Sequence, residues 1–453
     1  MSHVDSCCRS CRSLRSGSRS RSGRLSGGLA GTTGYLMISG GSPPAVRSAI
    51  MLSVMFVAIL LDRPALALRN VALAALVILV LSPQSLIDVG FQMSFAAVVA
   101  LISSVEAWQA WRRVREAGHE RGSGGLLTTA GFVGTIVLTT MIATVAVAPF
   151  AVYHFHKSTQ FAVLANLAAV PLCNLLVMPA ALATLIAMPF GVEAGPLWAM
   201  GAGIDGMSWV AGRVAALPGA VVLVPSIPTV AFGLMLCGGL WLCLWVHRWR
   251  LLGLLPIAAG LALSPTSRAP DVLIGAEGAL IAVRGANGRL AVLNAKRASF
   301  ELERWLQHDA DQRAANDVGP GDVIRCDGIG CQAIAAGARI AVARHPAALA
   351  DDCSRANLVI WLGEGTPKCG RTGGVIVVAR EAVVRDGTHA VFIGRTAGST
   401  GPYVASAANA GRQAVAEGIR ITIQTVAEAR GHRPWSMPHD GDRPWRTWRR
   451  PSR

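Results

Sequence analysis

The sequence predicts a polytopic α-helical membrane domain followed by a soluble α/β domain. Of the 453 residues, 52% are hydrophobic and 15% are charged, and the mean hydropathy is +0.45. That value is too high for a water-soluble globule of this size, so the composition disfavours an ordinary cytosolic enzyme and excludes a disordered or collagenous protein. The charges are also unevenly placed, since the 122 positions from 126 to 247 carry only Lys157, Glu193, Asp205 and Arg213. Such a segment cannot build a surface that faces water.

Apolar stretches of membrane-spanning length fill the first part of the chain. A hydrocarbon core of roughly 30 Å requires about 20 apolar residues in a helix. Seven stretches approach this length, and an eighth, shorter one leads into the soluble part: 45–61, 66–82, 86–104, 126–148, 160–189, 197–217, 226–247 and 251–265. The fifth contains Pro171 and Pro179. Because proline removes a backbone hydrogen bond, we expect this span to be broken or kinked.

Arginines between the spans predict the orientation. Arg63 and Arg69 flank the first connection, four more lie between residues 112 and 121, and Arg248 and Arg250 follow the seventh span. The positive-inside rule assigns these three loops to the cytoplasm. The three assignments agree with one another when the membrane crossings between the loops are counted. The count places the 150–160 loop and everything after residue 265 on the outer side.

Two basic tails account for much of the net charge of +16. Residues 1–36 are rich in Arg and Ser, and residues 430–453 are rich in Pro, Trp and Arg, so we expect both to be disordered. The amino-acid composition of the first tail is typical of GC-rich DNA that is translated from an upstream start or in another reading frame. We expect its cysteines to have no role in metal binding. Basic tails can indicate nucleic-acid binding, but such tails are more often solvated segments or segments at the membrane surface.

Residues 267–429 predict a separate α/β domain of ordinary composition. Residues 271–294 alternate short apolar runs with glycine-containing turns, as stacked hairpins do, and residues 299–310 have the pattern of an amphipathic helix with Phe300, Leu302, Trp305 and Leu306 on one side. Further strand-like runs lie at 338–343, 356–362, 374–379 and 389–394. A domain of this length can bury its own core.

The domain contains Cys326, Cys331, Cys353 and Cys369. An even number of cysteines on the outer side of a membrane predicts disulfides. Cys326 and Cys331 bracket a short DGIG turn, so we favour the pairing 326–331 with 353–369 among the three possible connectivities. A zinc site would need close CxxC pairs or histidines at ligand spacing, and neither is present.

Two motifs in the membrane domain carry a resemblance. The first comprises Pro83, Asp88, Gly90, Phe91, Gln92, Ser94 and Phe95, and the second comprises Asn166, Pro171, Leu172, Met178 and Pro179. In this order they resemble the competence domain of the ComEC family, the inner-membrane channel that internalises transforming DNA in bacteria. The resemblance covers roughly residues 38–265.

This resemblance implies a multi-pass protein of the bacterial inner membrane that helps to move single-stranded DNA, with other competence or DNA-translocation proteins as partners. It also implies that the chain is N-terminally truncated and that residues 267–429 form a periplasmic metallo-β-lactamase-like domain. No HxHxDH motif follows residue 265, and the histidines there are isolated in the sequence. We therefore expect a degenerate copy without metal, cofactor or hydrolytic activity.

Polar residues within the motifs are the candidate DNA path. Asp88 and Gln92 are four positions apart on one helix, with Gly90 between them to admit another backbone, and Asn166 and Asn174 are expected to share a face around the Pro171 break. Polar groups at membrane depth are costly unless they face a bundle interior or water. The alternative is helix–helix hydrogen bonding, or for Asp88 a simple helix cap. His154 and His156 lie on the predicted outer loop and are expected to be solvated.

Arg213, near the outer end of its span, is a further candidate for attracting phosphate, and its alternative is a side chain that snorkels to the interface. Three other functions stay open: a generic multi-pass permease for small solutes, a non-functional fragment, and a membrane-anchored hydrolase. The missing metal motif argues against the hydrolase. DNA rather than a solute as the cargo follows from the resemblance alone.

Overall fold

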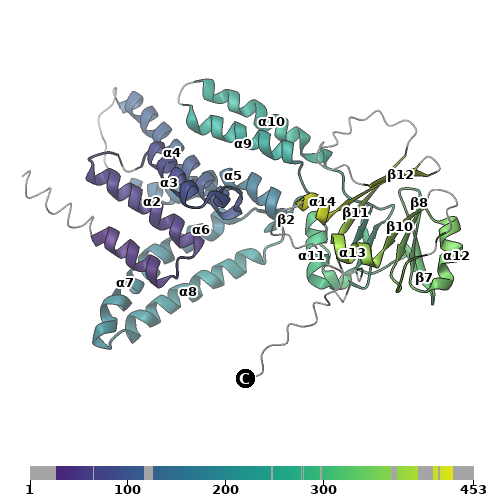
Figure 1. The fold of residues 1–453 in the computed structure, drawn as a ribbon. Helices are drawn as coiled ribbons and strands as arrows, with labels where there is room; N and C mark the ends of the chain where they lie inside the picture. The colour runs from purple at the N-terminus through teal and green to yellow at the C-terminus, as the bar shows by residue number, and fades with distance from the viewer. Residues whose placement is uncertain are drawn as a thin grey trace, which may run out of the picture. The chain divides into compact units, whose positions relative to one another are not determined.

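The computed structural model describes residues 27–431 apart from 65, 117–125, 246–247, 277, 279, 296–297, 368, 370–374, 396–411 and 417–418. Most of the two expected tails, and Arg121 of the expected cytoplasmic loop, therefore lie outside the described residues. The chain divides into two compact units, residues 1–266 and residues 267–453. The first is helical and the second is built around two larger β-sheets (Figure 1).

Apolar helices form the N-terminal unit, and each predicted span corresponds to one of them or to a pair. They are α2 (Pro43–Leu60), α3 (Leu68–Leu81), α4 (Val89–Glu116), α5 (Leu126–Phe155), α6 (Ala162–Leu172), α7 (Met178–Ala187), α8 (Ala194–Ala215), α9 (Thr229–Leu244) and α10 (Leu254–Leu263). Within the described residues, five helical stretches are long and apolar enough to cross a membrane: Pro43–Leu60, Val89–Ala110, Gly131–Phe155, Ala162–Phe190 and Arg248–Thr266. α3 and α9 are shorter apolar helices. The protein is a membrane protein.

The proline-rich fifth span is not broken. α6 and α7 are joined by a π-helical segment, Cys173–Val177, so helical structure continues from Ala162 to Ala187. Pro171 lies inside α6 and Pro179 lies in the first turn of α7. A π turn widens the helix and changes its hydrogen-bond pattern, which lets the chain pass two prolines without ending the helix.

Helical structure also begins earlier than expected. Residues 27–38 are helical, although the sequence predicted a disordered tail up to residue 36. The hydroxyls of Thr32 and Thr33 donate to the carbonyls of Gly28 and Leu29, at 2.8 Å and 2.9 Å. These local bonds satisfy the polar side chains on the helix itself, so the glycine and threonine content of the segment does not prevent helix formation.

Contacts between segments that are distant in sequence hold the helices of the N-terminal unit together. The strand β1 (Lys157–Thr159), which follows α5, pairs antiparallel with β2 (Val221–Leu223), which precedes α9. At the start of α3, the Leu68 amide donates to Glu106 Oε1 in the second half of α4, at 3.3 Å. The second contact brings the start of α3 beside the later part of α4, as expected for two helices that run in opposite directions.

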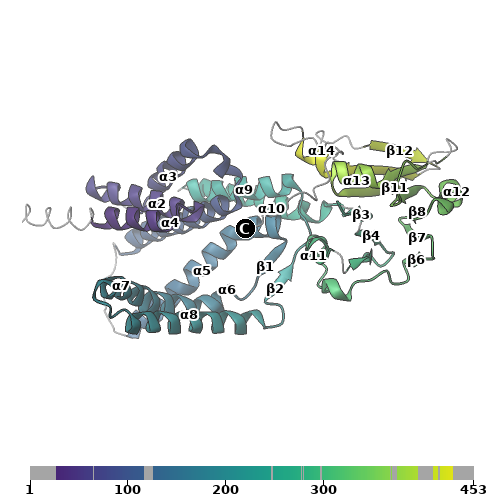
Figure 2. The same cartoon turned by 60° about the horizontal axis from the view of Figure 1, so that its bottom comes forward.

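Two sheets make up the C-terminal unit (Figures 1 and 2). The six-stranded sheet has the order β12 (Arg412–Ala416), β13 (Ile419–Thr425), β11 (His389–Arg395), β3 (Val272–Ile274), β4 (Ile281–Arg284), β5 (Leu290–Leu293), and all its pairs are antiparallel. The five-stranded sheet has the order β10 (Ile376–Ala379), β9 (Leu358–Trp361), β8 (Ala338–Ala343), β7 (Gly330–Ala335), β6 (Ile324–Cys326). The predicted hairpins of residues 271–294 are confirmed as β3, β4 and β5.

The sheets face one another across a shared core, and helices cover their outer faces. Alternate residues of each strand divide between the layers: Ile281 and Val283 lie in the core between the sheets, whereas Ala282 packs beneath α11 (Ser299–His308). On the other sheet, Val359 packs beneath α12 (Pro346–Arg355). The result is a four-layer α/β/β/α arrangement, which confirms the predicted α/β class of this domain.

The amphipathic helix at 299–308 is confirmed with one correction. Leu302 and Leu306 are buried and Trp305 is partly buried against the same core. Phe300 is 72% exposed instead and lies under the Arg304 guanidinium, 5.4 Å from its ring centroid. A cation–π contact at the surface thus takes the place of the expected core packing.

Two disulfides join the cysteines of this unit. Cys326 and Cys331 are directly opposed on β6 and β7, and Cys353 of α12 bonds Cys369. The first bridge closes a hairpin and the second fastens a helix to a loop. Both bridges suit an oxidising compartment.

Candidate functional site: a polar cluster at one end of the helical unit

Six polar or aromatic side chains from four helix ends make contact at one end of the N-terminal unit. They come from the starts of α2, α4 and α9 and from the last turn of α5, and we call them the end cluster: Arg47, Asp88, Gln92, Tyr153, His154 and Thr229. The sequence predicted two of them, Asp88 and Gln92. Figure 1 shows the helices that contribute to the cluster.

Asp88 has two structural roles. Its carboxylate accepts hydrogen bonds from the amides of Gly90 and Phe91, at 3.4 Å and 3.2 Å, and so caps the start of α4. The same carboxylate pairs with the Arg47 guanidinium of α2, with 2.5 Å between Asp88 Oδ2 and Arg47 NH1. The Asp88 side chain is 47% exposed and that of Arg47 only 13%. The helix cap that the sequence offered as an alternative is therefore present, together with an ion pair that sequence reasoning missed.

Gly90 makes room for this ion pair. A Cβ atom at position 90 would lie 2.7 Å from a terminal guanidinium nitrogen of Arg47. The sequence interpretation was that Gly90 admits another backbone, and this is wrong, because a side chain occupies the space. Glycine at this position lets the guanidinium lie over the first turn of α4, and a larger residue would make the flexible end of Arg47 shift.

Gln92 joins α4 to α5. Its side-chain oxygen lies 3.0 Å from His154 Nε2, and its amide nitrogen donates to the Leu86 carbonyl at 3.0 Å. His154 is half-buried within the last turn of α5, so the expectation of a solvated loop histidine is wrong. A hydrogen-bond partner 62 positions away draws the imidazole against the helices.

An aromatic stack extends the cluster to α9. The Tyr153 and Phe232 rings stack with their centroids 4.3 Å apart, and the Tyr153 hydroxyl lies 3.2 Å from Thr229 Oγ1. The His154 ring meets Tyr153 edge-on at 5.0 Å. Polar contacts thus connect α2 to α4, α4 to α5, and α5 to α9. Hydrogen-bonding groups that can also meet water therefore gather at these four helix ends.

The other predicted polar residues do not belong to the end cluster. Asn166 is half-buried in α6, whereas Asn174 is exposed in the π-helical segment. The common face that the sequence predicts for them stays a prediction, and a π-helical turn begins between the two residues. Arg213 is exposed near the end of α8, with its guanidinium 5.2 Å from the ring centroid of Trp209. That placement fits the interfacial alternative considered for Arg213.

The described part of the chain contains no group of three or more His, Cys, Asp or Glu side chains arranged to hold a metal ion. The described histidines of the C-terminal unit lie on separate elements. His345 caps α12 by accepting from the Ala347 amide, and the buried His389 bonds the Gly387 carbonyl. His432 and His439 lie outside the described residues.

The sequence profile of the competence protein family matches residues 7–249, which is more than half of the chain. The chain belongs to the competence protein family. It is also similar to ComE operon protein 3 of Bacillus subtilis (strain 168), with 26% identity over 164 residues. That alignment covers 36% of this chain and 19% of the relative. No solved structure matches significantly.

This membership confirms the resemblance that the two motifs predicted. The match also includes part of the N-terminal segment. Because it begins at residue 7, part of the Arg/Ser-rich region and the helical residues 27–38 fall within the family's sequence pattern.

Proposed function

We propose that this chain takes part in moving single-stranded DNA across the bacterial inner membrane, with the end cluster at the outer mouth of a polar path. The observation that carries the proposal is the family match, which spans every helix of the end cluster. A polyanion cannot cross hydrocarbon, so its route must be lined by groups able to replace water. The end cluster is a connected set of such groups from four helices. The partners are single-stranded DNA, the lipid bilayer and other competence or DNA-translocation proteins.

Deletion of the gene in its own host tests this function. We expect natural transformation by linear DNA to be lost and to return when the gene is supplied in trans. Electroporated plasmid should transform the deletion strain normally, because electroporation bypasses the membrane step. Normal natural transformation in the deletion strain would rule out the proposed role. A specific defect in the uptake of a small solute would favour the permease instead.

Orientation is the second part of the proposal: the end cluster and residues 267–453 face the periplasm. The arginine-rich loops at the opposite helix ends support this direction. Reporter fusions at Gly122, outside the described residues, and at Thr266 should report opposite compartments, with Gly122 cytoplasmic and Thr266 periplasmic. Both fusions active in the same compartment would contradict the topology.

For the C-terminal unit, we propose a metallo-β-lactamase-like fold that has lost its chemistry. The four-layer arrangement of two sheets between helices supports this assignment. The isolated histidines support a role other than hydrolysis, because a binuclear zinc site needs clustered ligands. In this proposal the unit is not an enzyme and takes no cofactor.

A further inference from the structure

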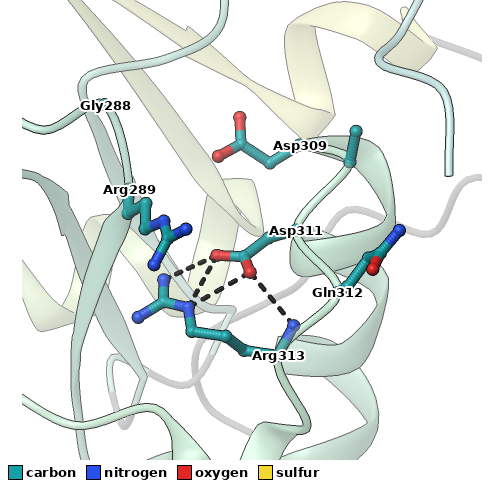
Figure 3. Close-up of a pocket in the computed structure, with 7 residues that line it drawn as sticks. Gly288, Arg289, Asp309, Asp311, Gln312 and Arg313 are labelled. Carbon is teal, nitrogen blue, oxygen red and sulfur yellow. Dashed lines mark hydrogen bonds and ion pairs between the residues drawn. The ribbon is translucent and has the colours of Figure 1, made fainter.

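A polar pocket opens on the C-terminal unit beside the end of α11. It is lined by Gly288 and Arg289 from the β4–β5 turn and by residues 309–313, which follow α11 (Figure 3). Charged side chains dominate its lining. An apolar ligand would have to strip water from these groups without replacing their hydrogen bonds, so the pocket suits a charged ligand.

Both carboxylates of the pocket are already neutralised. Asp309 accepts two parallel hydrogen bonds from Arg284, each 2.7 Å long, and both side chains are largely buried. Arg284 also donates to the Gly288 carbonyl at 2.6 Å, which fixes the turn against the end of α11. Asp309 is therefore paired with Arg284 and held in a fixed orientation.

Asp311 is paired in the same way with Arg313. The shortest of their contacts joins Asp311 Oδ2 and Arg313 NH2 at 2.6 Å, and that nitrogen also donates to the Leu290 carbonyl at 2.8 Å. Burial alone would raise the pKa of Asp311, but the hydrogen bonds from Arg313 and the charges of Arg313 and Arg289 outweigh it and lower the pKa. The carboxylate is thus ionised at neutral pH and is committed to Arg313.

Arg289 is the third cation of the group, in addition to the two that pair with the carboxylates. Its side chain is exposed, and Figure 3 shows its guanidinium directed into the pocket beside that of Arg313. The described side chains here, Arg284, Arg289 and Arg313 against Asp309 and Asp311, give three positive charges and two negative ones. His308 adds none near neutral pH, because burial lowers its pKa. Two guanidinium groups thus converge where one charge is unbalanced.

We propose that this pocket binds a phosphate group, with Arg289 as the principal ligand and Arg313 as a second cation beside it. A guanidinium offers a planar pair of donors that matches two phosphate oxygens, and the surplus positive charge of Arg289 attracts an anion. Gly288 has φ +77° and an ideal Cβ there would meet nothing within 4 Å, so the mouth of the pocket stays open on that side. A cationic ligand is disfavoured because both acids are occupied.

Equilibrium dialysis of the purified full-length protein in detergent, with labelled inorganic phosphate at low ionic strength, tests the proposal. We expect saturable binding of one phosphate per chain. Arg289→Gln should weaken binding at least about tenfold, because a hydrogen bond to a charged group contributes roughly 1.5–3 kcal/mol. Arg304→Gln is the matched control: it removes the same charge from α11, but its guanidinium lies over Phe300, and it should leave binding unchanged.

One further variant and one competition experiment define the ligand more closely. Arg289→Lys retains the charge without the planar donor pair, so it should bind with intermediate affinity. Competition by a nucleoside monophosphate against an oligonucleotide of equal total phosphate distinguishes a small phosphorylated ligand from a polynucleotide backbone. The proposal is overturned if the wild type shows no saturable phosphate binding. Equal losses in Arg289→Gln and Arg304→Gln would also overturn it, since they would indicate a non-specific effect of net charge.

Discussion

Asp88→Leu should destabilise the folded protein more than Arg47→Met does, although the two residues form one ion pair. Removing Asp88 uncaps α4 and leaves a guanidinium that is only 13% exposed without its carboxylate. Removing the carboxylate from a buried ion pair lowers the free energy of unfolding by about 3 kcal/mol. Removing Arg47 leaves a carboxylate that is 47% exposed and still caps the helix, at a cost of about 1 kcal/mol.

The measurement is a denaturant titration of the detergent-solubilised protein, together with its abundance in membranes. In the Arg47→Met background, Asp88→Leu should cost clearly less than it does alone, because no buried charge is then stranded. Equal effects of the two single variants, or strict additivity in the double variant, would show that the pair is not energetically coupled as its geometry indicates.

Gln92→Glu should lower DNA uptake by about tenfold or more while leaving the protein level near that of the wild type. A glutamate retains the oxygen that meets His154, so the link between α4 and α5 is kept. It loses the hydrogen bond from the amide nitrogen to the Leu86 carbonyl, but that bond is exposed to solvent, so its loss has a small effect on stability. Its charge would repel a passing phosphate, and a like charge about 10 Å away costs roughly 1–2 kcal/mol at an effective dielectric constant of 20. A loss of about 1.4 kcal/mol corresponds to a factor of ten.

Natural transformation frequency, normalised to protein level in membranes, measures this effect. Thr135→Val is the control, since Thr135 lies on the exposed surface of α5 and its hydroxyl bonds only the Gly131 carbonyl of its own helix. Gln92→Leu, which removes both hydrogen bonds, distinguishes the two roles of the residue. If only Gln92→Leu is defective, and in proportion to its abundance, then Gln92 is a structural residue and not part of a DNA path.

Much of the fold could be predicted because it follows from local patterns. Long apolar runs specified the helices, and the alternation in residues 271–294 specified the hairpins. The π turn at Cys173–Val177 was not predicted, because the sequence shows prolines there but gives no sign of the wider hydrogen-bond pattern. The helix at 27–38 was missed because the whole of residues 1–36 was assigned to one disordered tail from its Arg- and Ser-rich composition.

The site was harder to predict because its contacts are tertiary. Arg47 and Asp88 are 41 positions apart, and Gln92 and His154 are 62 apart, so no local motif connects them. One signal was available in the sequence. Arg47 lies at the end of its span opposite to the arginine-rich loops, which predicts that it needs a counter-charge, and Asp88 is an acid at the same end of a neighbouring span.

The central claim is that incoming DNA passes the end cluster, and site-specific photocrosslinking tests it most directly. A photoreactive amino acid would replace Gln92 in one variant and Leu185, an exposed apolar residue of α7, in another. Labelled transforming DNA would then be supplied to cells and illuminated during uptake. The account predicts a crosslink to single-stranded DNA at position 92 and none at position 185. Absence of a crosslink at position 92 in cells that still transform, or equal crosslinking at both positions, would contradict it.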